Sequence, residues 1–84
     1  MKIGGLLSVF QFLGEIADTV SEFCFGAIEL QREFYPDTVT EEDWAEAQRL
    51  IAASRESTNI IYDIRTAIAL ASLKERICPF LNKD

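Results

Sequence analysis

The sequence predicts an all-α fold: a long antiparallel helical hairpin that pairs with a second copy to form a four-helix bundle. Three features favour it. Polar positions recur at alternating spacings of three and four from Ser8 to Arg32, a proline stands at position 36, and residues 41–77 contain neither glycine nor proline. The 84 residues form one domain, 1–84. Such a short chain buries only roughly 60 % of its unfolded surface, so further burial against a partner is expected.

The first helix is expected over residues 5–34. All but one of the eight positions in the three-and-four series are polar, so they trace one stripe along the helix. The rest of the helix surface is apolar and is wider than a coiled-coil seam requires. The helix should end before Pro36, because proline disfavours helical geometry at the preceding residue, Tyr35.

A turn over residues 35–40 is expected to lead into the second helix, 41–77. Thr40 is the predicted N-cap, with Asp43 three residues later as in a capping box. Val39 and Trp44 have the spacing of a hydrophobic staple across this helix start. The acidic residues that follow Thr40 complement the positive end of the helix dipole.

The second helix should end near Ile77, because Cys78 precedes Pro79, and a short tail, 78–84, follows. Its apolar positions are interrupted by the polar segment 54–59. The main interpretation keeps the helix continuous through this gap. In the alternative, Ser57 or Thr58 caps a third helix, and the chain is a compact three-helix monomer.

Two long helices side by side enclose no core, so a second copy is expected to cover the wide apolar surface. The predicted core of this homodimer consists of Leu6, Phe10, Leu13, Val20, Ile61, Ile64 and Ile68. A turn centred near residue 37 places Cys24 beside Leu50 and Cys78 beyond the N-terminus. The three-helix alternative also leaves Cys78 past the level of Cys24, so both cysteines are expected to be reduced.

Composition argues against catalysis and against nucleic acid as a partner. The net charge is −6, and the eight basic residues are scattered rather than clustered on a phosphate-binding surface. The chain has no histidine, no paired-cysteine motif and no phosphate-binding glycine loop. The acidic residues near the turn lack the spacing of a calcium-binding loop. The sequence therefore predicts no enzyme, no cofactor and no metal.

A membrane or secreted location is not expected. The apolar run 3–13 is interrupted by Gln11 and followed by Glu15 and Asp18 without a cleavage site. No uncharged stretch of 18 residues is present. The expected location is cytoplasmic.

The predicted function is protein binding, as an adaptor, chaperone or inhibitor of a protein with a basic surface, of the kind that phages and mobile elements encode. Phe25, the one apolar residue on the polar stripe, is interpreted as an anchor ringed by acids; an exposed aromatic without a role is the alternative. The predicted contact residues are Glu15, Asp18, Glu22, Phe25, Glu29, Glu33, Asp37, Glu41 and Glu42.

Two other functions stay open. The apolar start of the first helix could lie on a membrane surface, although acids rather than basic residues flank it, which argues against membrane binding. A small ligand could instead bind between helices near Ser54, Ser57, Thr58 and Tyr62, a set supported only by the polar gap.

Overall fold

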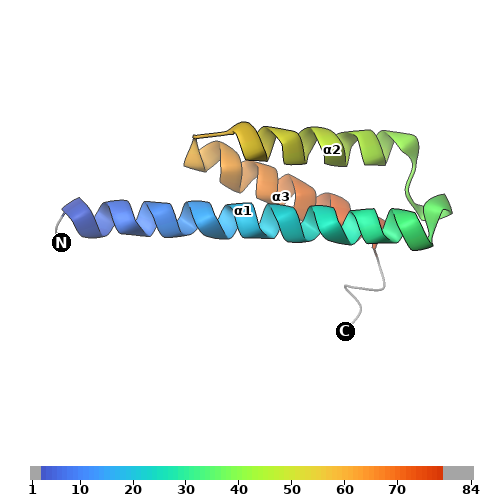
Figure 1. Cartoon of the computed structure of the whole chain (residues 1–84), viewed down its shortest axis with the longest axis horizontal. Coiled ribbons are helices and arrows are strands. Elements are labelled where there is room, and N and C mark those ends of the chain that lie inside the picture. The colour runs from blue at the N-terminus through green and yellow to red at the C-terminus, as the bar shows by residue number, and fades with distance from the viewer. Residues whose placement is uncertain (1–2, 79–84) are drawn as a thin grey trace.

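The computed structural model describes residues 3–78 and, from residue 11 onward, their side chains. It shows three packed α-helices: α1 (Ile3–Phe34), α2 (Glu41–Glu56) and α3 (Ile60–Ile77), with a short 3-10 turn, η1 (Pro36–Thr38), between α1 and α2. In Figure 1, α1 extends along nearly the whole length of the molecule, and its N-terminal turns project beyond both other helices. The all-α prediction is confirmed, with a different topology.

The predicted continuous second helix is wrong, because it breaks between Glu56 and Ile60. Ser57 has an extended backbone (φ −75°, ψ 141°), and its N–H donates to the Ser54 carbonyl at 3.3 Å. The Asn59 side chain then accepts from the backbone N–H groups of Ile61 and Tyr62 at 2.9 and 3.1 Å. The first backbone N–H groups of a helix have no acceptor within the helix, and the Asn59 side chain provides one for α3. The three compactly packed helices of the alternative are confirmed, with Asn59 as the cap rather than Ser57 or Thr58.

The predicted N-cap at Thr40 is confirmed, whereas the capping box is not formed, because the Asp43 carboxylate pairs with Arg76 of α3. The Thr40 side chain accepts from the Asp43 backbone N–H at 3.0 Å, as an N-cap does. Val39 is buried, and Trp44 packs against the same core cluster. Gln31 near the end of α1 donates to the Thr38 hydroxyl at 2.9 Å, which fixes η1 against α1.

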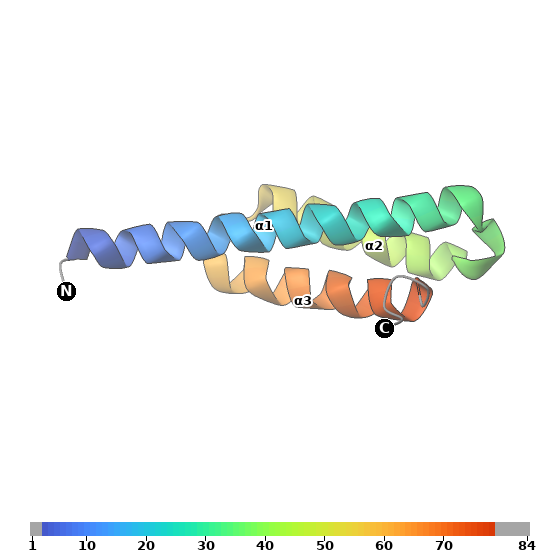
Figure 2. The ribbon, with the colours of Figure 1, turned by 90° about the horizontal axis from the view of Figure 1, so that it is seen from below.

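Helix α3 runs parallel to α1, and α2 runs antiparallel to both. A Cβ placed on Gly14 would lie 3.8 Å from Ile60 at the start of α3, and the Cys78 thiol at its end lies 3.8 Å from the Ala27 carbonyl. The packing of α3 against α1 is the most extensive of the three helix pairs. Figure 2 shows these two helices side by side, with α2 behind them.

The core lies between all three helices. Its buried members are Cys24, Ile28, Val39, Ala47, Ile51, Leu70, Leu73, Ile77 and Cys78. The prediction that Cys78 lies well beyond the level of Cys24 is therefore wrong, because the parallel α3 brings Cys78 beside Ala27, one turn from Cys24 on α1. Both cysteines are free thiols, as expected, and burial raises the pKa of each.

Candidate interaction surfaces

The acidic stripe, which we define as Glu15, Asp18, Glu22, Glu29 and Glu33, follows one exposed side of α1. The spacings of three, four and seven place these side chains on the same side of the helix. Within residues 11–78, Glu15, Asp18, Glu29 and Glu33 form no ion pair. The stripe therefore presents net negative charge to solvent, with Arg55 the nearby cation that interacts with both Glu22 and Glu29.

Glu22 differs from the other stripe members because α2 reaches it. Arg55 near the end of α2 donates two hydrogen bonds to the Glu22 carboxylate, at 2.7 and 2.9 Å. This fork lowers the pKa of Glu22, mainly through the hydrogen bonds themselves. Glu22 is thus a tie between α1 and α2 as well as part of the stripe, a role that the periodicity of α1 alone could not reveal.

Asp18 lies in an unfavourable electrostatic environment. Its pKa is raised, first by partial desolvation and then by the negative charges of Asp63 and Glu22. Asp63 is 8 % exposed, and its Oδ1 has no hydrogen-bond partner among the described residues; the same holds for the buried Ser21 hydroxyl. Buried polar atoms without partners cost stability.

The remaining predicted acidic contacts lie at the turn. Asp37 belongs to η1, and Glu41 and Glu42 occupy the first turn of α2, all three exposed. They form a second acidic group at the end of the molecule that lies opposite the free N-terminal turns of α1 (Figure 1). Asp43 beside them is paired with Arg76 of α3 at 2.7 Å.

Phe25 is not an exposed anchor, so that prediction is wrong. Its ring stacks on Trp44 of α2, with ring centroids 5.5 Å apart and an interplanar angle of 22°. Arg55 lies 5.9 Å above the Phe25 ring, and Arg32 lies 4.7 Å above Trp44. Phe25 packs against the core because α2 covers this part of the polar stripe.

The apolar face lies on the side of α1 and α3 turned away from α2. Its α1 members are Phe12, Leu13, Ile16, Val20, Phe23, Leu30 and Phe34, and its α3 members are Ile61, Ile64 and Ile68. All are exposed except Ile64, which is half-buried. Figure 2 views the molecule from this side. The face is far larger than the scattered apolar residues of an ordinary protein surface.

Most of the predicted dimer core meets on this face. Leu13, Val20, Ile64 and Ile68 line one groove of ≈ 290 Å³ between α1 and α3. Ile61 is exposed one helical turn from Ile64. The side chains of Leu6 and Phe10 lie outside the described residues.

A second, mainly apolar groove, of ≈ 640 Å³, lies further along α1. It is lined by Phe23, Gly26, Ala27, Leu30 and Phe34, with Glu22, Gln31 and Tyr35 at the same groove. A Cβ added to Gly26 would meet no atom within 4 Å. Here the backbone of α1 is open to close approach by another chain.

The polar gap does not form an enclosed ligand site. Asp18, Glu22, Ser54, Arg55 and Ser57 line an open groove of ≈ 280 Å³, in which Arg55 already pairs with Glu22. Thr58 and Tyr62, predicted to belong to it, are exposed outside this lining.

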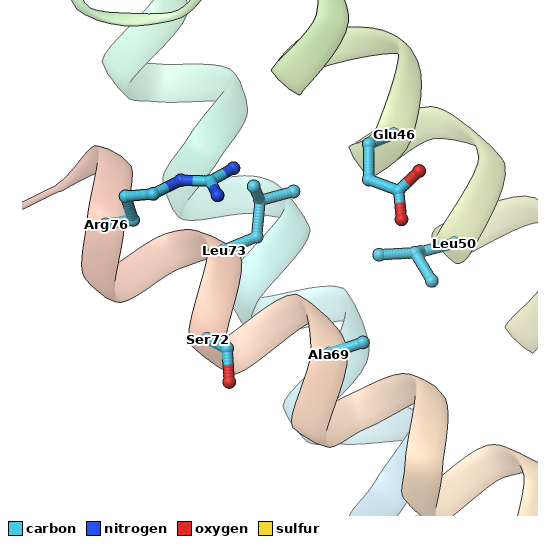
Figure 3. A pocket seen from close by; sticks show the side chains of 6 residues that line it. All are labelled: Glu46, Leu50, Ala69, Ser72, Leu73 and Arg76. Carbon is cyan, nitrogen blue, oxygen red and sulfur yellow. The ribbon is translucent and has the colours of Figure 1, made fainter.

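A further pocket, of ≈ 350 Å³, lies between α2 and α3. Figure 3 shows Glu46 and Leu50 on α2 facing Leu73 and Arg76 on α3. Its two charged groups have partners elsewhere, because Glu46 accepts hydrogen bonds from Arg49, and Arg76 donates to Asp43.

Comparisons with protein-family models, curated proteins and solved structures each gave no match. In the described part of the chain, no group of three or more acidic or cysteine side chains is placed to hold a metal ion. Within residues 3–78, no helix combines the length and apolar content that a bilayer span requires.

Proposed function

We propose that this chain is a non-catalytic protein-binding module that works as a homodimer and engages a basic protein surface, as an adaptor, chaperone or inhibitor. The proposal rests on one observation above all: α1 exposes two surfaces of different chemistry. The acidic stripe follows one side of the helix, and the apolar face follows another, turned away from α2. A helix whose only task was to complete its own core would expose far less apolar surface.

The acidic stripe is the surface proposed for the basic partner. Its carboxylates are exposed and mostly unpaired, so they can accept hydrogen bonds from lysine and arginine side chains. Charge of one sign on an exposed surface also accelerates encounter with an oppositely charged protein. The turn acids Asp37, Glu41 and Glu42 extend the same negative potential past the end of α1.

The apolar face is the surface proposed for the second copy. Because each protomer is a three-helix unit, the proposed dimer has six helices rather than the four of two hairpins. The two surfaces meet at Glu22, which lines the second apolar groove. Self-association buries the apolar face and leaves the other four acids of each stripe exposed.

Affinity capture from the native host's lysate tests the binding role. The bait would be the wild-type chain, a stripe variant (Glu15→Lys with Glu29→Lys) and a control (Glu46→Lys with Glu56→Lys) that changes the net charge equally on α2. We expect a captured protein that the control retains and that the stripe variant loses by at least tenfold, with wild-type binding weakened by salt. Equal capture by all three chains would show that the stripe is not the contact surface.

A further inference from the structure

We infer that two copies associate antiparallel along α1, so that the N-terminal turns of α1 from one copy lie in the apolar groove on the C-terminal half of α1 of the other. This inference rests on the dimer proposed above and adds its arrangement. Four observations carry it: the unequal lengths of α1 and α3, the shape of the groove, the distribution of charge and the area of the face.

Helix α1 extends past α3 at both ends. Helix α3 begins beside Gly14 and ends beside Ala27, whereas α1 continues from Ile3 to Phe34. At about 1.5 Å per residue, the turns that precede Gly14 are on the order of 16 Å long, and those from Ala27 to Phe34 about 10 Å. An antiparallel partner places the uncovered N-terminal turns of each copy against the uncovered C-terminal turns of the other. A parallel partner would place the two N-terminal segments against each other, and the two C-terminal segments likewise.

The groove has the form that a docked helix requires. Phe23, Leu30 and Phe34 stand along it, and Gly26 lies between them without a side chain. A glycine at this point permits the backbone of a second helix to come closer than any other residue would. Gly26 has no positive φ and no internal contact that calls for glycine, so nothing within the described protomer explains it.

The charges permit this contact although the chain carries a net charge of −6. Residues 3–14 contain no charged residue, and the ten members of the apolar face are uncharged. Glu22 is the one charged residue that lines the groove, and its carboxylate is paired with Arg55. The acids of the turn, Asp37, Glu41 and Glu42, all lie near one end of the molecule. An antiparallel pair places these two ends far apart, and a parallel pair would bring them together against mutual repulsion.

The area is sufficient for a stable pair. Phe12, Phe23 and Phe34 leave 61 %, 68 % and 67 % of their surface exposed. An aromatic side chain presents roughly 150–250 Å², so these three rings expose on the order of 400 Å² per copy. Leu30, Ile61 and Ile68 are also more than half exposed. A standard interface covers about 800 Å² per partner, and the whole face approaches this value.

Charge exchange between two variants tests the arrangement. Phe12 and Leu30 are each nine residues from Ser21 near the middle of α1, so a twofold axis at that level brings Phe12 of one copy beside Leu30 of the other. Phe12→Glu alone and Leu30→Lys alone should each weaken dimerisation at least tenfold, measured by sedimentation or light scattering. An equimolar mixture should recover it, because Glu and Lys then face each other. Ala52→Lys, at an exposed position on α2, is the control that should leave dimerisation unchanged.

Three outcomes contradict parts of this proposal. A wild-type chain that stays monomeric at hundreds of micromolar would overturn the dimer and its arrangement together. A dimeric wild type whose two variants dimerise normally, or do not recover on mixing, would overturn the antiparallel arrangement alone. Co-sedimentation of the monomeric wild type with phosphatidylcholine and phosphatidylserine vesicles would assign the apolar face to a lipid surface instead. Circular dichroism of each variant at low concentration shows whether the protomer fold is retained.

Discussion

Arg55 and Glu22 join the end of α2 to the middle of α1 through two hydrogen bonds, of 2.7 and 2.9 Å. The same guanidinium lies 5.9 Å above the Phe25 ring, so one side chain connects the acidic stripe to the aromatic contact with Trp44. The pair closes the bundle just before the chain turns into α3.

Loss of this pair should make stability less dependent on pH. Arg55 holds the pKa of Glu22 below its ordinary value of 4.5, so the pair stabilises the folded chain above pH 4.5, and this stabilisation is lost as the pH falls through the lowered value. Arg55→Gln should therefore lower the Tm at pH 7 and have a smaller effect in more acidic solution. Arg49→Gln is the matched control, because Arg49 pairs with Glu46 on its own helix and ties no two elements together. Equal melting curves for wild type and Arg55→Gln at pH 7 would contradict this role.

Asp18→Asn should raise the stability of the folded chain at pH 7, whereas Arg55→Gln should lower it. The pKa of Asp18 is raised above 3.8 by desolvation and by Asp63 and Glu22, so its charged form destabilises the folded chain at neutral pH. The substitution should raise the Tm at pH 7, and the gain should shrink as the pH falls through the raised value and disappear below about 3.8. Thermal melts across pH 3 to 8 would measure it, and a lower Tm at pH 7 would show that Asp18 is held by favourable contacts instead.

The break between α2 and α3 depends on Asn59. Asn59→Ala removes an acceptor for two backbone N–H groups and should reduce the free energy of unfolding by about 1 kcal/mol, as for other N-caps. Asn59→Asp keeps an acceptor at this position and should lose much less. Urea unfolding monitored by circular dichroism provides the measurement. If Asn59→Ala were as stable as the wild type, the helix would be continuing through the gap.

Alanine substitutions of Phe25 and Phe23 test which of the two rings packs against the core and which is exposed. Phe25→Ala removes a ring from the α1 and α2 contact and should cost about 2 kcal/mol, less than the roughly 3 to 5 kcal/mol of a fully buried phenylalanine. Phe23→Ala should change the stability of the monomer by no more than about 0.5 kcal/mol, because this ring is mainly exposed. Both are measured by urea unfolding at a concentration where the chain is monomeric. The reverse order would mean that Phe25 faces solvent.

Gly26→Ala should stabilise the isolated protomer. Glycine in a helix interior is less favourable than alanine by about 1 kcal/mol, and the added Cβ meets no atom within 4 Å. The same variant should weaken the proposed dimer, because a methyl group then stands in the groove. Chemical unfolding at low concentration and sedimentation at high concentration separate the two effects. A destabilised monomer would show that the groove is already filled.

The helix ends that depend on neighbouring residues could be predicted from the sequence, whereas the break between α2 and α3 could not. Pro36, Thr40 and Pro79 determine where helices end or start, because proline geometry and N-capping act within a few residues. The break at 57–59 is harder to predict, because Ser57, Thr58 and Asn59 can occupy either the interior of a helix or its N-cap. The capped form prevails because it folds α3 back onto the apolar side of α1.

Some features of the candidate surfaces could likewise be predicted from the sequence, and others could not. The exposed positions of Leu13, Val20, Ile61 and Ile68 follow from helix periodicity and a surplus of apolar residues. The burial of Phe25 could not follow from the sequence of α1 alone, since it depends on where α2 crosses that helix. The tie between Glu22 and Arg55 likewise joins residues 33 positions apart.

The parallel course of α1 and α3 brings Cys24 and Cys78 into one core cluster, although more than half of the chain separates them. The reaction of these two buried thiols can therefore be used to measure how often the helices separate. A thiol reagent can reach either sulfur only when α3 separates from α1, and the raised pKa of both thiols slows their reaction further. Labelling that proceeds at the same rate at both cysteines would mean that the bundle opens as one cooperative unit, whereas faster labelling at Cys78 would reveal that the end of α3 frays first.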